Sequence, residues 1–436
     1  MIEKIKEILA NHKDISGYKI KETTIHSNEL FFVKKNVDMD RAKRVHHYNL
    51  TVYVDFTEDG MNYKGSSNTD IHPTMNDTEI ESAIRETAFA AKFVKNPYYP
   101  LVQPAESQQA SALSAFAKES FPYWMNEITK AIYKNDIYEK GGINSCEIFL
   151  DKIETRIVNS EGVDVTDTGY RCMIEFITTW KEEGEEIELY RRIDCSDFDE
   201  ELFAEEVKNM ITICRERAIA TSTPALKTAS VILTREAVKD FFSYYYSKSN
   251  AASVYNQSST WKVGDQLQGK EVKGDRITMT LDPFMKNSTD SESFDSEGFP
   301  LKPVKLIEDG ELKRYAADTR YAYYLGVVPT GNIGNIIIES GSKTIEELKK
   351  EPYLMTTAFS DFTVDTMTGD FCGEIRLATY FDGRTTTPVT GGSVTGNINE
   401  LHHELYLSRE RSKDNNFEGP AMIMLKNVTV AGIAKD

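Results

Sequence analysis

The feature that most constrains this chain is a break near its middle, at Thr221-Ser222-Thr223-Pro224. Small polar residues and a proline interrupt an amphipathic helical pattern there, just before an apolar segment with strand character begins. The chain's 436 residues also exceed what one ordinary hydrophobic core organises. The sequence therefore predicts two domains, 1–220 and 221–436.

The first domain mixes helical and strand patterns, which predicts an α+β fold. Leu50 to Phe56 alternates with the period of a half-buried strand. Thr78 and Glu81 have the spacing of a capping box, which predicts a helix from there to Asn96-Pro97. Tyr98 to Ala115 reads as an irregular connection. Further helices are expected around 2–9, 124–132 and 203–214, and further strands around 146–150 and 172–176.

The second domain is expected to be mainly antiparallel sheet. Asp309-Gly310 and Asp382-Gly383 each separate two short segments of strand character, and Asp-Gly is a strong hairpin signal. A capping pair predicts a short helix from Thr344 to Lys350, and an apolar strand from Met422 to Val430 ends the domain. The chain as a whole is therefore predicted to be α+β, with an α+β domain followed by a mainly antiparallel β domain.

The chain's charge and hydropathy limit whether it can bind nucleic acid or cross a membrane. The formal net charge of −18 disfavours direct nucleic-acid binding, because phosphate backbones are bound through Lys and Arg. The densest basic run, Arg41 to Arg44 followed by His46-His47, is interpreted as a solvated loop. No stretch approaches the roughly 20 apolar residues that cross a bilayer, so no membrane span is expected. The charged N-terminus lacks a secretion signal, which predicts a cytoplasmic protein.

Histidine is scarce where metal chemistry would need it. None of the seven histidines lies between residues 73 and 401, and neither HExxH nor HExxxH occurs. His402 and His403, with Glu404, could still hold a metal, although adjacent histidines on an apparent loop are more often surface residues. Cys372 beside a tight turn is an alternative nucleophile without a neighbouring base in sequence. The five cysteines lack CxxC spacing and are expected to be reduced and mostly buried.

Two further features of the second domain are an aromatic run and a strand that leads directly into a helix. Phe241-Phe242 with Tyr244-Tyr245-Tyr246 could line a peptide groove but is more typical of a core or a subunit interface. A predicted strand from Ala229 to Thr234 runs directly into a helical pattern that begins at Arg235.

Several different short motifs follow one another along the chain. In the second domain they are Phe294-Asp295-Ser296-Glu297-Gly298, Ile307-Glu308-Asp309-Gly310-Glu311-Leu312, Tyr324-Leu325-Gly326, Thr330-Gly331-Asn332, Thr368-Gly369-Asp370-Phe371, Thr395-Gly396-Asn397 and Val428-Thr429-Val430-Ala431-Gly432. Weaker ones in the first domain are Asn159-Ser160-Glu161-Gly162-Val163 and Lys95-Asn96-Pro97-Tyr98. Their order resembles the TldD/PmbA family, long labelled modulators of DNA gyrase. The resemblance implies a dimeric intracellular assembly that degrades or processes peptides.

The family has two types, and the resemblance places this chain with the second. The TldD type carries HExxxH at the start of a helix plus a C-terminal cysteine that completes a zinc site, whereas the TldE (PmbA) type does not. Here Arg235 and Asp240 stand at the histidine positions and Glu236 at the glutamate. The segment from Ser408 to Gly419, where the cysteine belongs, contains none. Glu236 alone is interpreted as a solvated residue in the first turn of the helix, favoured by the helix dipole.

These observations predict a non-metal-binding, TldE-like subunit that guides peptides and completes the chamber of a zinc-bearing TldD-type partner. No catalytic or metal-binding residue and no cofactor is expected in this chain, because zinc is expected in the partner. Heterodimer and homodimer both stay open. Peptide contacts are predicted at Phe294, Asp295, Gly298, Thr330, Gly331 and Asn332. The alternative is a self-sufficient divergent peptidase that uses Cys372 or a His402/His403 metal site, and direct binding of gyrase or DNA is a third, disfavoured hypothesis.

Overall fold

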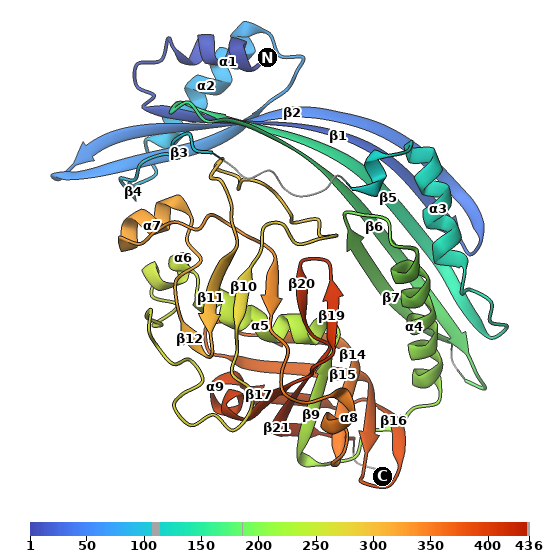
Figure 1. Cartoon of the computed structure of the whole chain (residues 1–436). Helices are drawn as coiled ribbons and strands as arrows, with labels where there is room; N and C mark the ends of the chain where they lie inside the picture. Colours follow the sequence, from blue (N-terminus) through green and yellow to red (C-terminus); the bar gives the residue numbers. More distant parts are fainter. Residues whose placement is uncertain (107–113, 185, 434–436) are drawn as a thin grey trace.

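The computed structural model describes residues 1–106, 114–184 and 186–433 of the chain. A seven-stranded antiparallel sheet of long strands forms an arch over a second body, which contains a six-stranded and an eight-stranded sheet (Figure 1). The arch has the strand order β4-β3-β2-β1-β5-β6-β7. Its strands are β1 (Gly17–Val33), β2 (Asn36–Glu58), β3 (Met61–Ile71), β4 (Asn96–Pro97), β5 (Gly141–Asn159), β6 (Asp164–Lys181) and β7 (Glu186–Cys195).

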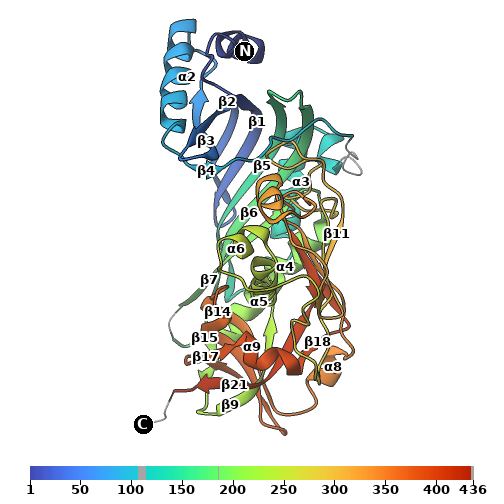
Figure 2. The ribbon, with the colours of Figure 1, turned by 90° about the vertical axis from the view of Figure 1, so that its left-hand side faces the viewer.

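Two pairs of helices cover one face of the arch, one pair at each end (Figures 1 and 2). The first pair packs on Ile20 of β1 and the second on Phe32 of the same strand. Because the side chains of a strand alternate between two faces, these even-numbered positions lie on one side. The helices are α1 (Ile2–Leu9), α2 (Asp77–Ala91), α3 (Phe121–Tyr133) and α4 (Glu200–Ala218). The odd-numbered face is therefore turned toward the second body.

Two details of the first domain correct the sequence predictions. The capping box of α2 is formed by Asn76 and Glu79 rather than by Thr78 and Glu81, so the helix begins earlier and ends at Ala91. The basic run from Arg41 to His47 is not a loop but part of β2, and Arg41 and Lys43 both pair with the buried carboxylate of Glu29 on β1. Of the predicted irregular connection, residues 107–113 lie outside the described residues.

After α4 the chain passes into the second body through β8 (Thr221–Ser222), which pairs with β16. One sheet has the order β12-β11-β10-β13-β20-β19. Its strands are β10 (Met279–Leu281), β11 (Val304–Glu308), β12 (Glu311–Leu312), β13 (Ile336–Ile338), β19 (Arg411–Asp414) and β20 (Phe417–Pro420). The predicted Asp309-Gly310 turn joins β11 to β12, which pair antiparallel.

The other sheet of this body closes on itself. Its order is β14-β9-β21-β17-β15-β16-β8, and β14 also pairs with β15, so five strands complete a ring. The strands are β9 (Lys227–Thr234), β14 (Tyr353–Val364), β15 (Asp370–Phe381), β16 (Thr386–Thr390), β17 (Ser393–Asn397) and β21 (Met422–Ala431), with β18 (Leu405–Leu407) paired to β21. The predicted turn at Asp382-Gly383 joins β15 to β16.

Helix α5 (Glu236–Lys248) lies between the two sheets of the second body (Figure 1). The other helices of this body are short: α6 (Ala251–Tyr255), α7 (Thr319–Leu325), α8 (Ile345–Leu348) and α9 (Ile398–Leu401). The aromatic run of α5 is core, as one of its two interpretations had it, because Phe241, Phe242 and Tyr245 are fully buried among side chains of both sheets. No helix of the described residues is both long and apolar enough to cross a membrane.

Replacing a buried aromatic residue of α5 tests this central position. Phe241 has no exposed surface, so Phe241→Ala should lower the free energy of unfolding by about 4 kcal/mol through lost burial and a residual cavity. Phe89→Ala on α2, where the ring is 63% exposed, is the matched control and should change it by less than about 1 kcal/mol. Urea denaturation of both variants measures the difference, and equal losses would contradict the assignment of α5 to the core.

Candidate functional site

The junction between β9 and α5 has an unusual backbone. Arg235 is the N-cap of α5, with φ 58° and ψ −134°, and its side chain makes no capping hydrogen bond. A non-glycine residue rarely adopts positive φ, and such a conformation persists only where its surroundings hold it. The guanidinium of Arg235 is held by the carboxylate of Glu206 on α4. The strained residue is thus tied to the first domain.

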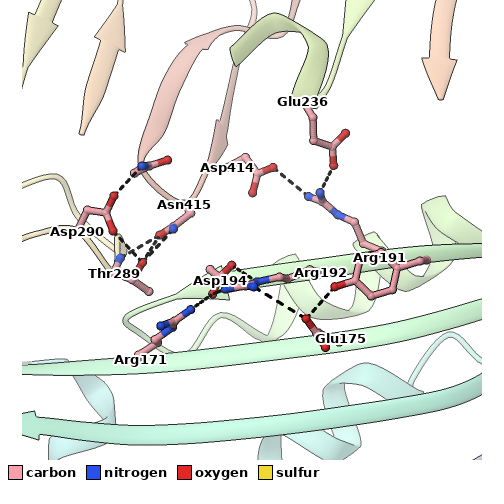
Figure 3. A network of polar contacts seen from close by, with 12 residues as sticks. Arg171, Glu175, Arg191, Arg192, Asp194, Glu236, Thr289, Asp290, Asp414 and Asn415 are labelled. Atoms are coloured by element: carbon pink, nitrogen blue, oxygen red, sulfur yellow. Dashed lines mark hydrogen bonds and ion pairs between the residues drawn. The ribbon is translucent and has the colours of Figure 1, made fainter. Parts of the chain in front are cut away.

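A second arginine, Arg191, links the same junction to other elements, and Figure 3 shows its contacts with Glu236 and Asp414. Arg191 on β7 donates from Nε to Glu206 Oε1 at 2.6 Å and from Nη2 to Asp414 Oδ2 at 3.1 Å. Its third group, Nη1, pairs with Glu236 at the start of α5. Only 14% of the Arg191 side chain and 11% of the Glu206 side chain are exposed. Burial alone would lower the pKa of Arg191, but Asp414, Glu236 and Glu206 outweigh it and raise that pKa above its ordinary value.

We define the Arg191 network as Arg191, Arg235, Glu206, Glu236 and Asp414. Glu236 is about half exposed, as predicted, but it is not simply solvated because it contacts both arginines. The network joins β7 and α4 of the first domain to α5 and β19 of the second. Arg191, Glu206 and Asp414 were not identified from the sequence, where no local spacing connects them.

Asp240 lies one turn further along α5 and is partly buried. Burial, together with the nearby charges of Glu236 and Asp361, raises the pKa of its carboxyl to about 6, while Lys239 acts in the opposite direction. The ammonium of Lys239 donates to Asn416 Oδ1 at 2.6 Å, which places the turn between β19 and β20 against the helix. The segment in which a third metal ligand was sought therefore does lie beside α5.

The donor set at this junction does not fit zinc. Zinc sites use imidazole, thiolate and carboxylate ligands, whereas the guanidinium of Arg235 carries no lone pair to donate and repels a dication. Glu236 and Asp414 both contact Arg191, and Asp240 is the one remaining carboxylate of the motif. Among the residues that the structure describes, no group of three His, Cys, Asp or Glu could hold a metal ion.

The alternative histidine site has a different geometry from the one expected. His402 is 6% exposed rather than a surface residue, because its ring packs beside Tyr245. Its Nδ1 lies 2.9 Å from the Tyr245 hydroxyl. Burial, with a smaller contribution from His403, lowers the pKa of His402 to about 4, so the ring is neutral at physiological pH. His402 thus has an internal partner that explains its burial.

Cys372 is the one exposed thiol among the five cysteines, and the other four are buried. It points outward from β15, opposite Thr395 on β17 and Thr363 on β14, into an open cavity of about 630 Å³. The cavity is lined by threonine, asparagine and acidic side chains, and no histidine lines it. The described residues therefore bring no imidazole base to this thiol.

The residues predicted to contact peptide support one another around a turn. Asp295 is 1% exposed, and its carboxylate accepts hydrogen bonds from the backbone amides of Glu297 at 2.9 Å, Phe299 at 3.1 Å and Asn332 at 3.2 Å. Thr330 accepts from the amide of Ala317 at 2.8 Å. These side chains hold the loop at 293–300 against the loop at 330–332.

Two glycines of the same group need their special backbone. Gly298 (φ 81°) lies against Val163 of the first domain, and Gly331 (φ 74°) lies against Leu301, so a Cβ would collide at either position. Phe294 is buried and, with Asp295, lines a cavity of about 570 Å³ between the two domains. Contact between peptide and these six residues stays a prediction.

Comparisons with known proteins agree with this architecture. Residues 226–432 match the family model of the PmbA/TldA metallopeptidase C-terminal domain. A curated relative from Methanocaldococcus jannaschii, named only as an uncharacterized protein, is 25% identical over 288 residues, which is 63% of this chain and 65% of that protein. Metalloprotease PmbA of Escherichia coli O157:H7 is 26% identical over 196 residues, 43% of each chain. The matches thus span less than two thirds of these relatives' own lengths.

Solved structures share the fold over nearly the whole chain. TldE from Thermococcus kodakarensis has a TM-score of 0.77 at 19% identity and covers 98% of this chain and 99% of its own. A putative modulator of a DNA gyrase from Thermotoga maritima has a TM-score of 0.78 at 18% identity, with 99% and 100% covered. The resemblance that the short motifs indicated is thereby confirmed, as is the mixed, mainly antiparallel fold.

Replacing Arg191 should weaken the contact between the two domains. Arg191→Gln leaves the carboxylates of Glu206, Glu236 and Asp414 without their shared cation, and losing one partner of a buried network costs about 3 kcal/mol of unfolding free energy. Arg156→Gln, which breaks an exposed pair with Asp164, should cost less than about 1 kcal/mol. Urea denaturation measures both, and a comparable effect of the two changes would show that the network contributes no more than a surface pair.

Asp240 gives a pH dependence of definite sign. A carboxyl whose pKa is raised on folding penalises the folded state once the pH exceeds its unfolded value, and the penalty is complete above the folded value of about 6. Asp240→Asn should therefore stabilise the protein at pH 7.5, by an amount on the order of 2 kcal/mol, and the gain should shrink toward pH 4. Asp38→Asn, at an exposed position of β2, is the control. A gain for Asp240→Asn that grows as the pH falls would contradict the assignment.

Proposed function

We propose that this chain, whose residues 226–432 belong to the PmbA/TldA metallopeptidase C-terminal domain family, is a non-metal-binding subunit of a two-component peptidase. One observation carries the proposal. The start of α5, where the TldD type has its metal-binding motif, is occupied by the Arg191 network, in which Arg235 and Glu236 are engaged by side chains of the same chain. Zinc is supplied by a TldD-type homologue that pairs with this chain.

The role of this chain is to complete the chamber and to guide peptide. β19 is the last strand of its six-stranded sheet, and an extended peptide can add to such an edge through backbone hydrogen bonds. Asp414 at the end of β19 contacts Arg191, so the edge begins beside the Arg191 network. A peptide on this edge would have one end beside the Arg191 network.

The proposal extends to the partner and the compartment. Strong net negative charge disfavours nucleic acid, so we assign the chain to peptide handling rather than to direct contact with DNA or gyrase. We place the complex in the cytoplasm, as a heterodimer with the zinc-bearing homologue, and a homodimer is the form expected when that homologue is absent.

The rival hypothesis is a self-sufficient peptidase that uses Cys372 or His402 and His403. The buried, neutral His402 is already engaged by Tyr245, and histidine is missing from the lining of the Cys372 cavity. Both observations favour the subunit role.

Reconstitution tests the proposal. The purified chain, assayed alone for zinc by mass spectrometry and for hydrolysis of a quenched-fluorescence peptide, should hold less than about 0.1 zinc per chain and be inert. Adding a purified TldD-type homologue should produce hydrolysis at least about tenfold above that of the homologue alone. Glu236→Gln should leave this activity within about twofold, because the residue has no metal-bound water to activate.

Two results would overturn the proposal in different ways. Stoichiometric zinc that is lost in His402→Ala/His403→Ala would favour the metal-site rival. Hydrolysis by the chain alone that is abolished in Cys372→Ser but kept in Cys214→Ser, a buried thiol, would favour the nucleophile rival.

A further inference from the structure

The cavity between the two domains has a floor that the strand register defines. Antiparallel pairing places Lys21 of β1 opposite Ile157 of β5, and Ile153 of β5 opposite Gly169 of β6. These odd-numbered positions point away from the four covering helices and toward the second body. Arg171 of β6 extends the same face toward the edge of the sheet. The floor therefore has isoleucines in its centre and cations on both sides, and it also carries Asp167 of β6.

The cationic end of the floor carries two guanidinium groups that share one carboxylate. Arg192 donates to Asp194 from Nε at 2.6 Å and from Nη2 at 2.9 Å, and Arg171 donates to the same carboxylate from Nη2 at 3.3 Å. The single carboxylate of Asp194 thus pairs with two guanidinium groups. Glu175 lies further away, at 3.9 Å from Arg192. In the described part of the chain, the Nε of Arg171 is buried and has no acceptor.

The opposite wall is the segment 289–296 together with Asn415. Two of its acidic groups already accept hydrogen bonds from other groups, and the third has a raised pKa. These carboxyl groups therefore compete less strongly with a ligand for the arginines. Asp290 accepts from the Asn416 amide at 2.6 Å, and Asp295 is satisfied by backbone amides. Glu292 is reached by solvent but lies inside the cavity, where burial, with smaller contributions from Asp295 and other carboxylates, raises the pKa of its carboxyl to about 7.

The backbone amide of Ser293 in the wall donates to Asp167 Oδ2 of β6 at 2.9 Å, so the two sides touch at that point. Figure 3 shows Arg171, Arg192 and Asp194 along the sheet and Thr289, Asp290 and Asn415 above them, each group bonded within itself. The space between them belongs to the cavity of about 570 Å³, which is large enough for a few peptide residues. The side chains of Arg171 and Arg192 are each 40% exposed, so an anion in this space can reach guanidinium groups that share a single carboxylate.

We propose that this inter-domain cavity binds a carboxylate of a peptide, held by Arg171 and Arg192, with an adjoining apolar side chain against Ile153 and Ile157. Guanidinium forks match the planar geometry of a carboxylate and form charge-assisted hydrogen bonds with it. The carboxylate is the C-terminus of the peptide or the side chain of an Asp or Glu. This inference deepens the proposed function, on which it rests, by naming the chemical group that the chain recognises.

Matched synthetic peptides test the site on the full-length chain. The probes are fluorescein-Gly-Ala-Leu-Leu as free acid, the same peptide as C-terminal amide, and fluorescein-Gly-Glu-Leu-Leu amide, all followed by fluorescence polarisation. The free acid should bind about tenfold more tightly than the Ala-containing amide, as expected for one charge-assisted bidentate contact. Tight binding of the Glu-containing amide would assign the site to side-chain carboxylates as well. Tight binding of the free acid alone would assign it to the C-terminus.

Variants distinguish binding at Arg171 and Arg192 from nonspecific attraction to positive charge. Arg171→Gln and Arg192→Gln should each remove the preference for the acid, whereas Arg156→Gln, on the opposite face of β5, should keep it. Arg171→Lys keeps the charge without the fork and should retain part of the preference, which guards against loss through misfolding. Equal affinity of the wild type for all three peptides, absence of any binding up to about 1 mM peptide, or an unchanged preference in Arg171→Gln would each overturn the proposal.

The outcome is independent of the reconstitution assay. An acid preference in a chain that never activates a TldD-type homologue would keep the binding site and reject the subunit role. An active complex whose isolated subunit binds all three peptides equally would keep the subunit role and reject the binding site.

Discussion

The structure depends on one buried cation, Arg191, which holds three carboxylates from three elements. β7 is the last strand of the arch, and α5 begins at a strained residue with no side-chain cap. Because Arg191 contacts Glu206, Glu236 and Asp414 together, the arch and the second body share one fixed point. The same contacts that fix the domains occupy the start of α5, so domain architecture and the side chains available at this junction depend on one another.

Local signals predicted much of the fold. Periodicity located the helix at 203–214, and the two Asp-Gly turns each join antiparallel strands, because these features depend on neighbours in sequence. The capping box of α2 shows the limit of such signals: Asn76/Glu79 and Thr78/Glu81 have the same spacing, and only packing of the helix chooses between them. The family resemblance was likewise carried by short turn motifs and was confirmed.

The candidate site was harder to predict, since its parts meet only through tertiary structure. Tyr245 and His402 are 157 residues apart, so the burial of that histidine has no local signature. Arg191 and Asp414 are separated by 223 residues. The alternation of β6 and β7 does carry a usable signal for the inter-domain cavity, because it places Arg171 and Asp194 on one face once the neighbouring strand is known.

The closed ring of β14, β9, β21, β17 and β15 has a consequence for how the second body can yield. Each of its strands is hydrogen-bonded on both sides, so unzipping cannot begin at a free margin as it can in an open sheet. Strands with a single partner lie outside the ring, at β8 and β18 of the same sheet and at β12 and β19 of the six-stranded sheet, and loosening is expected to start there. The ring is therefore the rigid part of the second body. When a ligand enters between the domains, we expect the segment 289–296 to deform and the ring to keep its shape.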